Sequence, residues 1–150
     1  MGLFPVSGVS VVNSLVTVLV DADNLTGSRL QSLSEALDVV PPSDRRVVVV
    51  GSEEALERAS WPDDAVLIEA SGWQAADVVL AGEYAHATGP LVIASGDGDF
   101  GLLAQRHIWP VLVISAAPSA AYKKPGITRI DPVHEGTAPI RAWLASVLVI

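Results

Sequence analysis

The chain contains no cysteine, only two lysines and few aromatic residues, and each scarcity narrows what it can be. Without cysteine it has neither disulfide bonds nor thiolate metal ligands, so any bound metal must be held by oxygen or histidine ligands. Aromatic residues make up 5% of the chain, whereas 50% of its 150 residues are hydrophobic, mainly Val, Leu, Ile and Ala. Such a composition is typical of strands that are covered on both faces.

Positive charge is also scarce. The formal net charge is −8, which gives no electrostatic footprint for non-specific binding to duplex nucleic acid. An acidic balance is nevertheless compatible with a cluster of carboxylates that binds divalent cations. No stretch reaches the roughly 18 uninterrupted apolar residues of a membrane span, and the apolar residues 1–20 lack the basic start and cleavage site of a signal peptide. We therefore expect a cytoplasmic protein with no membrane segment.

Apolar runs alternate with amphipathic stretches along most of the chain. Short apolar runs predict strands at 14–20, 46–50, 65–69, 90–94 and 109–114. Helical spacing of apolar residues predicts helices at 27–40, directly after Ser52, at 73–87 with Val78, Val79 and Leu80 facing inward, and at 101–106. In the tail we expect a short strand at 127–130 and a closing helix at 138–149.

Strands that alternate with helices indicate right-handed crossovers and a parallel sheet. We therefore expect one α/β domain over residues 1–150, built as a three-layer sandwich around a central, mostly parallel sheet of about five strands. The part after residue 115 is expected either to pack on this domain or to form an interface.

Two of the predicted strands end in a pair of aspartates spaced by one residue. Asp21 and Asp23 follow the first strand, and Asp97 and Asp99 follow the fourth. Ligands of open α/β sheets bind beyond the carboxyl ends of strands, so these carboxylates converge if the two strands are neighbours. Converging carboxylates repel each other, so they either raise one another's pKa or recruit a cation, and a hard ion such as Mg²⁺ prefers oxygen ligands. A single aspartate at such a place is commonly just a helix cap, but two pairs favour a metal site.

Three segments resemble the motifs of one family. VDADN at 20–24 resembles the opening D-x-x-N motif of NYN domains, the LabA-like branch of the PIN-like nucleases. SGDGDF at 95–100 matches their S-G-D-x-D-F motif, and ADVVLAGE at 76–83 resembles V-D-x-x-L-x-x-D with Glu83 in place of the second Asp. The resemblance covers residues 15–115, about two-thirds of the chain.

The resemblance implies a PIN-like, Rossmann-like fold and hydrolysis of single-stranded RNA with Mg²⁺ or Mn²⁺ as the cofactor. Under it, the catalytic and metal-binding residues are Asp21, Asp77, Asp97 and Asp99. The supporting residues under it are Asn24, Ser95, Asp23 and Glu83. The chemistry implied is attack by metal-activated water on a phosphodiester.

Two other functions stay open. A non-catalytic PIN-like module that binds RNA or protein is favoured by the low basic content and by Gln74, which stands where the family often has a lysine. A haloacid dehalogenase-like phosphatase also opens with D-x-D, using the first Asp as nucleophile and the second as acid or base. Its pattern needs a lysine between the motifs, and none occurs between Asp21 and Asp97.

The tail provides two further predictions. Lys123 and Lys124, next to Tyr122, are candidates for binding a backbone phosphate, although a solvated loop is the favoured explanation for them. The closing residues 142–150 are very apolar for a terminus. An exposed apolar stretch usually marks an interface, so we expect a homodimer or a partner protein there.

Overall fold

A single parallel sheet forms the centre of the molecule. The computed structural model describes residues 15–70, 72, 75–95, 101–115 and 125–148. The described strands are β2 (Val16–Asp21), β3 (Arg45–Gly51), β4 (Val66–Glu69), β5 (Leu91–Ala94), β6 (Val111–Ile114) and β7 (Ile127–Ile130). They lie in the order β4-β3-β2-β5-β6-β7, and every neighbouring pair is parallel. All strands therefore present their carboxyl ends to the same edge of the sheet.

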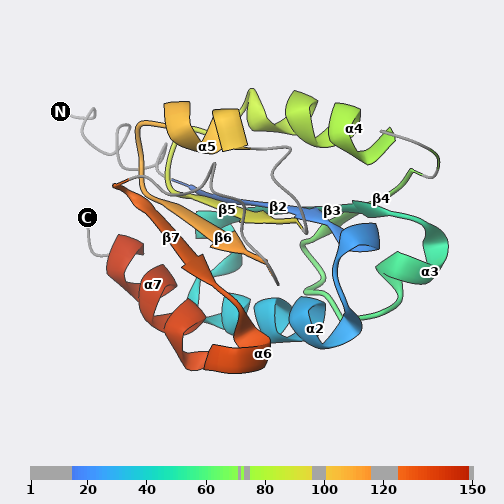
Figure 1. Ribbon diagram of the computed structural model, residues 1–150, viewed down its shortest axis with the longest axis horizontal. Coiled ribbons are helices and arrows are strands. Elements are labelled where there is room, and N and C mark those ends of the chain that lie inside the picture. Colours follow the sequence, from blue (N-terminus) through green and yellow to red (C-terminus); the bar gives the residue numbers. More distant parts are fainter. Residues whose placement is uncertain (1–14, 71, 73–74, 96–100, 116–124, 149–150) are drawn as a thin grey trace, which may run out of the picture.

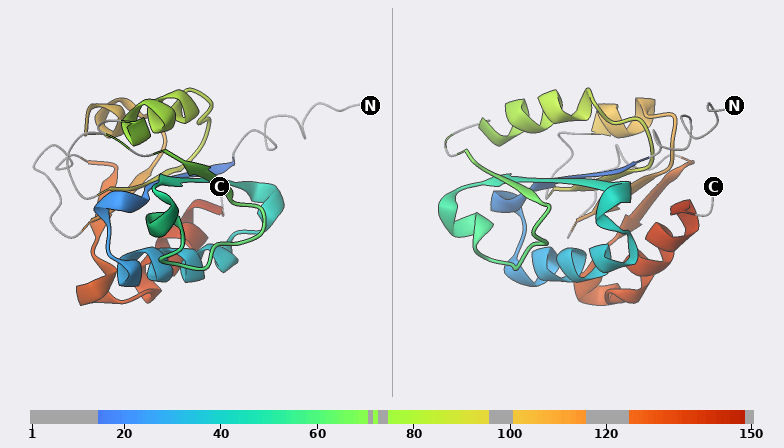
Figure 2. Two further views of the ribbon diagram at one scale, coloured as in Figure 1. Left: turned by 90° about the vertical axis from the view of Figure 1, so that its right-hand side faces the viewer. Right: turned by 180° about the vertical axis from the view of Figure 1, so that it is seen from behind.

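Helices cover the sheet on both faces (Figure 1). The described α-helices are α2 (Gly27–Ala36), α3 (Glu53–Leu56), α4 (Ala75–Tyr84), α5 (Gly101–Arg106), α6 (Pro132–Glu135) and α7 (Ala138–Leu148). Short 3-10 turns are η1 (Ala22–Asn24), η2 (Leu37–Val39) and η3 (Pro42–Asp44). Figure 2 shows α4 and α5 on one side of the sheet and α2, α6 and α7 on the other. The architecture is therefore the expected three-layer α/β sandwich.

The alternation of side chains along the strands divides the interior into two cores. Val18 and Val20 of β2 pack with Leu30 and Leu33 of α2 on one face. Leu19 of the same strand packs on the other face, in the core that includes Leu80 of α4. Every residue of β2 is buried, because a central parallel strand is covered on both sides. The ends of β2 are therefore held firmly in place.

The strands predicted from the sequence are all present, with bounds that differ by at most two residues. The described part of the chain contributes six strands to the sheet where about five were expected, because Ile127–Ile130 pairs with β6 along its whole length. The inward orientation predicted for Val78 is wrong, since this side chain is 72% exposed whereas Leu80 is 1% exposed. Consecutive helical residues are about 100° apart, so Val78, Val79 and Leu80 cannot all face the sheet.

The C-terminal region packs on the rest of the chain. Ile140, Leu144 and Val147 of α7 are buried in the core that α2 shares with the sheet. Leu144 and Val147 of the predicted interface segment 142–150 therefore pack within the chain, and a homodimer or a partner protein there stays a prediction. Among the described residues, no helix has the length and apolar character needed to cross a membrane.

Candidate metal site

The carboxyl edge between β2 and β5 is where the direction of strand succession reverses. From β2 the chain proceeds to β3 and β4 on one side, and it returns to β5, β6 and β7 on the other. In open parallel sheets this switch point is the usual place for ligands, because the loops on its two sides diverge and leave a crevice. Val20 pairs with Ala94 in the register of β2 and β5. The next residues, Asp21 and Ser95, therefore lie side by side. This adjacency of the two strands is the condition under which their terminal aspartates were expected to converge.

Asp21 is the last residue of β2 and is only 2% exposed. The side-chain amide of Asn24, three residues later in η1, donates a hydrogen bond to Oδ2 of Asp21. A carboxylate so deeply buried needs charged or hydrogen-bonding partners, since removing an ion from water is costly. Asp21 and Asn24 thus form one unit, and the D-x-x-N spacing matches the single turn that joins them.

Asp23 has a different environment, although it is only two residues away. It is exposed, and both of its carboxylate oxygens accept hydrogen bonds from Ser52, which follows β3. The Ser52 backbone N–H lies 3.0 Å from Oδ2, and the Ser52 hydroxyl lies 2.8 Å from Oδ1. Asp23 therefore joins the turn after β2 to the neighbouring loop.

Polar residues continue along the same edge beyond Ser95. The backbone N–H of Ser95 donates to the Ile114 carbonyl of β6, and that of Ser115 donates to the Ile130 carbonyl of β7. Both serines are fully buried. Asp21, Ser95, Ser115 and Asp131 consequently form one row across four adjacent strands. Ser115 and Asp131 share a signal that the sequence shows, a polar residue directly after an apolar strand.

Asp131 at the end of this row is occupied by structural contacts. Arg29 of α2 binds both carboxylate oxygens, with Nε–Oδ1 at 2.9 Å and Nη2–Oδ2 at 3.1 Å. Oδ1 also accepts the Val133 backbone N–H and so caps α6. The hydrogen bonds from Arg29 hold the pKa of Asp131 below its ordinary value. This carboxylate fastens β7 to α2, so it is not available as a metal ligand.

Asp77 and Glu83, which share α4, occupy opposite ends of that helix. Asp77 is half-buried in the first turn of α4. This is the end of the helix that comes after the carboxyl end of β4 in the chain. Glu83 forms an ion pair with Arg46, which pairs with Thr17 near the start of the strands. Six residues of helix span about 9 Å, which separates the two carboxylates along the sheet. The structure therefore does not bring Glu83 to the edge where Asp21 lies.

Several predicted site residues lie outside the described part of the chain. They are Asp97, Asp99, Lys123 and Lys124, together with Gln74. Asp97 and Asp99 follow Ser95 by two and four positions in the sequence. Within the described ranges, no group of three or more Asp, Glu or His side chains is placed to hold a metal. A site of several carboxylates at Asp21 thus requires the residues after Ser95.

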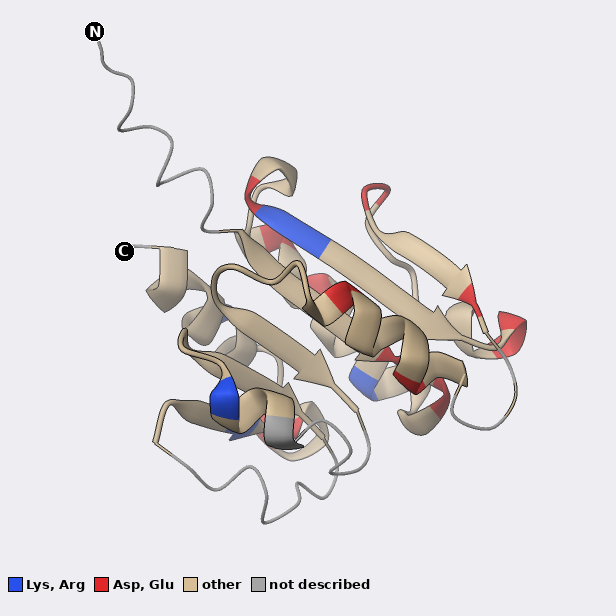
Figure 3. Ribbon diagram, turned by 90° about the horizontal axis from the view of Figure 1, so that it is seen from above, with Lys and Arg blue, Asp and Glu red and all other residues tan. Residues whose placement is uncertain are grey.

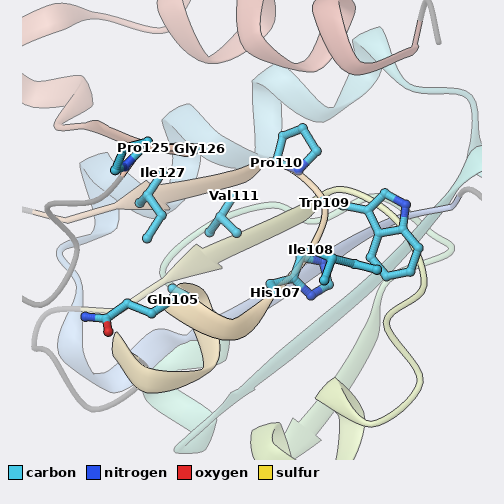
Figure 4. Close-up of a pocket in the computed structure, with 10 residues that line it drawn as sticks. Gln105, His107, Ile108, Trp109, Pro110, Val111, Pro125, Gly126 and Ile127 are labelled. Atoms are coloured by element: carbon cyan, nitrogen blue, oxygen red, sulfur yellow. The ribbon is translucent and has the colours of Figure 1, made fainter.

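An apolar pocket at the opposite edge of the sheet has no such chemistry (Figure 4). It lies near the C-terminal end of α5 and is lined by residues such as Trp109, Val111 and Ile127, the last two being the first residues of β6 and β7. His107 beside it binds the Gly89 carbonyl through Nε2 and the Tyr84 hydroxyl through Nδ1. These bonds explain the histidine as a structural residue at the amino edge.

Comparison with family models, with curated proteins and with solved structures finds no match to this chain. The described residues define an α/β protein with six parallel strands in one sheet and a buried aspartate at its switch point.

Proposed function

We propose that the protein is a metal-dependent endoribonuclease that hydrolyses phosphodiester bonds of single-stranded RNA. The observation that carries this proposal is the adjacency of β2 and β5, which places Asp21 next to the start of the S-G-D-G-D segment at Ser95. The D-x-x-N motif and Ser95, the first residue of the second motif, thereby lie together at the switch point of the sheet, a usual place for ligands.

The donor set fits a hard divalent cation. Asp21 supplies a buried carboxylate on a rigid central strand, and the proposed further ligands are Asp77, Asp97 and Asp99. Mg²⁺ and Mn²⁺ prefer oxygen ligands, and the chain offers no thiolate. Such a cation, when bound, would activate water and offset negative charge on the phosphodiester.

The residues around Asp21 explain how the chain would prepare this site. Burial on β2 holds the backbone of Asp21 in place, and the Asn24 amide orients the carboxylate by occupying Oδ2. The acidic surface would repel RNA at a distance, as the predominance of Asp and Glu over Lys and Arg in Figure 3 illustrates. Cation binding offsets this repulsion locally, so RNA binding is expected to depend strongly on the metal.

Contacts of Asp23 favour the nuclease over the phosphatase. A haloacid dehalogenase-like mechanism needs the second Asp of D-x-D as a proton donor and acceptor beside the substrate. Here both oxygens of Asp23 accept hydrogen bonds from Ser52 on the neighbouring loop. Both oxygens of Asp23 are thus directed at Ser52 of the neighbouring loop, whereas a general acid or base must face the substrate.

Cleavage of labelled single-stranded RNA with Mn²⁺ or Mg²⁺ tests the proposal. Asp21→Asn and Asp97→Asn should each lower the rate by at least about 100-fold, because each change removes a charged ligand from the cation. Asp63→Asn is the matched control, since Asp63 is an exposed aspartate before β4, at the other edge of the sheet. Its rate should stay within about twofold of wild type.

Equal cleavage by wild type and by both site variants would place the activity elsewhere or in a contaminant. If wild type binds RNA without cleaving it in either metal, the protein is a binding module and the proposed activity is wrong.

A further inference from the structure

The turn that follows Asp21 is held from outside by a second segment of the chain. This turn, residues 22–25, contains η1, and a backbone hydrogen bond from the Leu25 N–H to the Ala22 carbonyl closes it. The segment 51–58, which contains the end of β3 and helix α3, contacts it through both side chains and backbone. We refer to residues 51–58 as the brace.

The first contact of the brace is the Ser52–Asp23 pair. Ser52 donates twice to Asp23, and its hydroxyl oxygen also accepts the Ala55 backbone N–H at 3.2 Å as the cap of α3. The Ser52 hydroxyl thus uses its donor toward the turn and an acceptor toward the helix. Asp23 is thereby tied to the start of α3.

The second contact is made by Arg58. Its Nη1 lies 3.4 Å from the Ala22 carbonyl and 3.3 Å from the Leu25 carbonyl, the two ends of the turn. Its Nη2 binds Glu54 one helical turn earlier, at 3.0 Å. One guanidinium therefore spans the turn while Glu54 orients it.

Close packing leaves little room for the turn to shift toward the brace. A Cβ added at Gly51 would lie 3.1 Å from the Ala22 Cβ and 3.4 Å from Oδ2 of Asp23. A Cβ added at Gly27, just after the turn, would lie 3.3 Å from the Arg58 carbonyl oxygen. The two glycines permit the brace and the turn to approach this closely.

From these contacts we infer that Asp23, Ser52 and Arg58 are positioning residues for Asp21 and Asn24, and that Asp23 is not a metal ligand. Movement of the turn would rotate Asn24, whose amide orients Asp21. The inference rests on the proposed function, because it assigns a role relative to the metal that Asp21 is proposed to bind. In the D-x-D pair, Asp21 is then the proposed metal ligand, and Asp23 holds the turn that positions it.

Titration calorimetry with Mn²⁺ tests the inference through a conservative rescue. Asp23→Ala removes both bonds to Ser52 and should weaken Mn²⁺ binding by about 10-fold or more, as is typical for partners of metal-binding side chains. Asp23→Asn should stay within about threefold of wild type, because an amide can accept from the Ser52 N–H and donate to its hydroxyl oxygen. Asp21→Asn should lose about 100-fold.

Ser52→Ala supplies a second, independent variant and a double-mutant cycle. Because Asp23 and Ser52 act through one contact, the double variant Asp23→Ala, Ser52→Ala should bind Mn²⁺ no more weakly than Asp23→Ala alone, within about twofold. Arg58→Lys should weaken binding less than Arg58→Ala, since a lysine keeps the charge but reaches only one of the two carbonyls. Thermal unfolding identifies any variant that has lost its fold.

The outcomes separate this inference from the proposed function. If wild type binds Mn²⁺ and Asp23→Asn loses as much affinity as Asp21→Asn, Asp23 is a ligand and the inference is wrong. Unchanged affinity in both Asp23→Ala and Ser52→Ala also overturns it. If wild type binds no Mn²⁺, the proposed metal site fails, and the positioning role fails with it.

Discussion

The two edges of the sheet carry polar residues of very different kinds. At the carboxyl edge, Asp21 and Ser95 lie side by side at the switch point, buried and next to the segment with two further aspartates. At the amino edge, Arg45 forms an ion pair with Asp64 and also binds the Leu37 and Val40 carbonyls. The amino edge therefore shows a structural ion pair, whereas the carboxyl edge holds a buried aspartate at its switch point and an ion pair, Arg29–Asp131, at its β7 end.

This difference follows from the direction of the strands. In a parallel sheet the crossovers leave a crevice only at the carboxyl edge, so ligand chemistry concentrates there and the other edge is available for stabilising contacts. The pKa of Asp64 is lowered by its hydrogen bonds with Arg45, which is the behaviour of a structural ion pair. The difference between the edges would not hold if the Arg29–Asp131 pair affected metal binding, or if a residue of the amino edge did.

The largest effect on stability is expected at the carboxyl edge itself, at Asp131. Asp131→Asn should lower the free energy of unfolding by about 2 kcal/mol at pH 7, because it weakens a largely buried, two-bonded contact with Arg29. Arg29 holds the pKa of Asp131 below its ordinary value, so this stabilisation is complete above the unfolded value of about 3.9 and is lost as the pH falls further. Urea unfolding from pH 7 to pH 3 measures it.

The stability difference between wild type and Asp131→Asn should therefore stay constant from neutral pH to about pH 5 and shrink below about pH 4. A difference that grows on acidification would contradict the assigned ionisation. Asp38→Asn is the matched control, since Asp38 is exposed and lies 3.7 Å from Arg141. Affinity for Mn²⁺ should be unaffected in both variants.

The smallest effect is expected at the amino edge. Glu83→Gln removes the charge of the Arg46–Glu83 pair, whose side chains are 42% and 23% exposed. Pairs so open to solvent contribute less than about 1 kcal/mol, and salt screens them, so the loss should vanish at high ionic strength. Binding of Mn²⁺ should stay within about twofold, since Glu83 is remote from Asp21.

A tenfold loss of Mn²⁺ affinity in Glu83→Gln would show that Glu83 contributes to metal binding. Metal binding would then no longer be confined to the carboxyl edge. The companion variant Arg46→Met should match Glu83→Gln in stability, because both break the same pair.

The sequence predicted the sheet and the position of Asp21 at the end of β2 for simple reasons. Runs such as VTVLV are apolar on both faces, so they predict buried parallel strands. An aspartate directly after such a run must then lie at the carboxyl end of the strand, as Asp21 does. The sequence did not predict the pairing of Asp23 with Ser52, which joins two loops 29 residues apart and has no periodic signal. It also placed Glu83 near the site through a motif, although helix geometry carries that residue to the other edge.

Two other differences have local causes. Helix α6 was not predicted because its four residues show no apolar period, although Asp131 before Pro132 is a good start signal. Hydrophobicity alone suggests that Val78 faces inward, but its position around the helix axis, opposite the buried face that holds Leu80, exposes it.

The most direct test of the central claim is to locate the bound cation by the broadening of backbone amide signals in NMR spectra with substoichiometric Mn²⁺. We predict selective broadening of the amides of residues 21–25, 52 and 95, at the carboxyl edge between β2 and β5. Signals from residues 45–46 and 107, at the amino edge, should keep their intensity. Broadening at the amino edge, or no selective broadening at all, would contradict a metal site at Asp21.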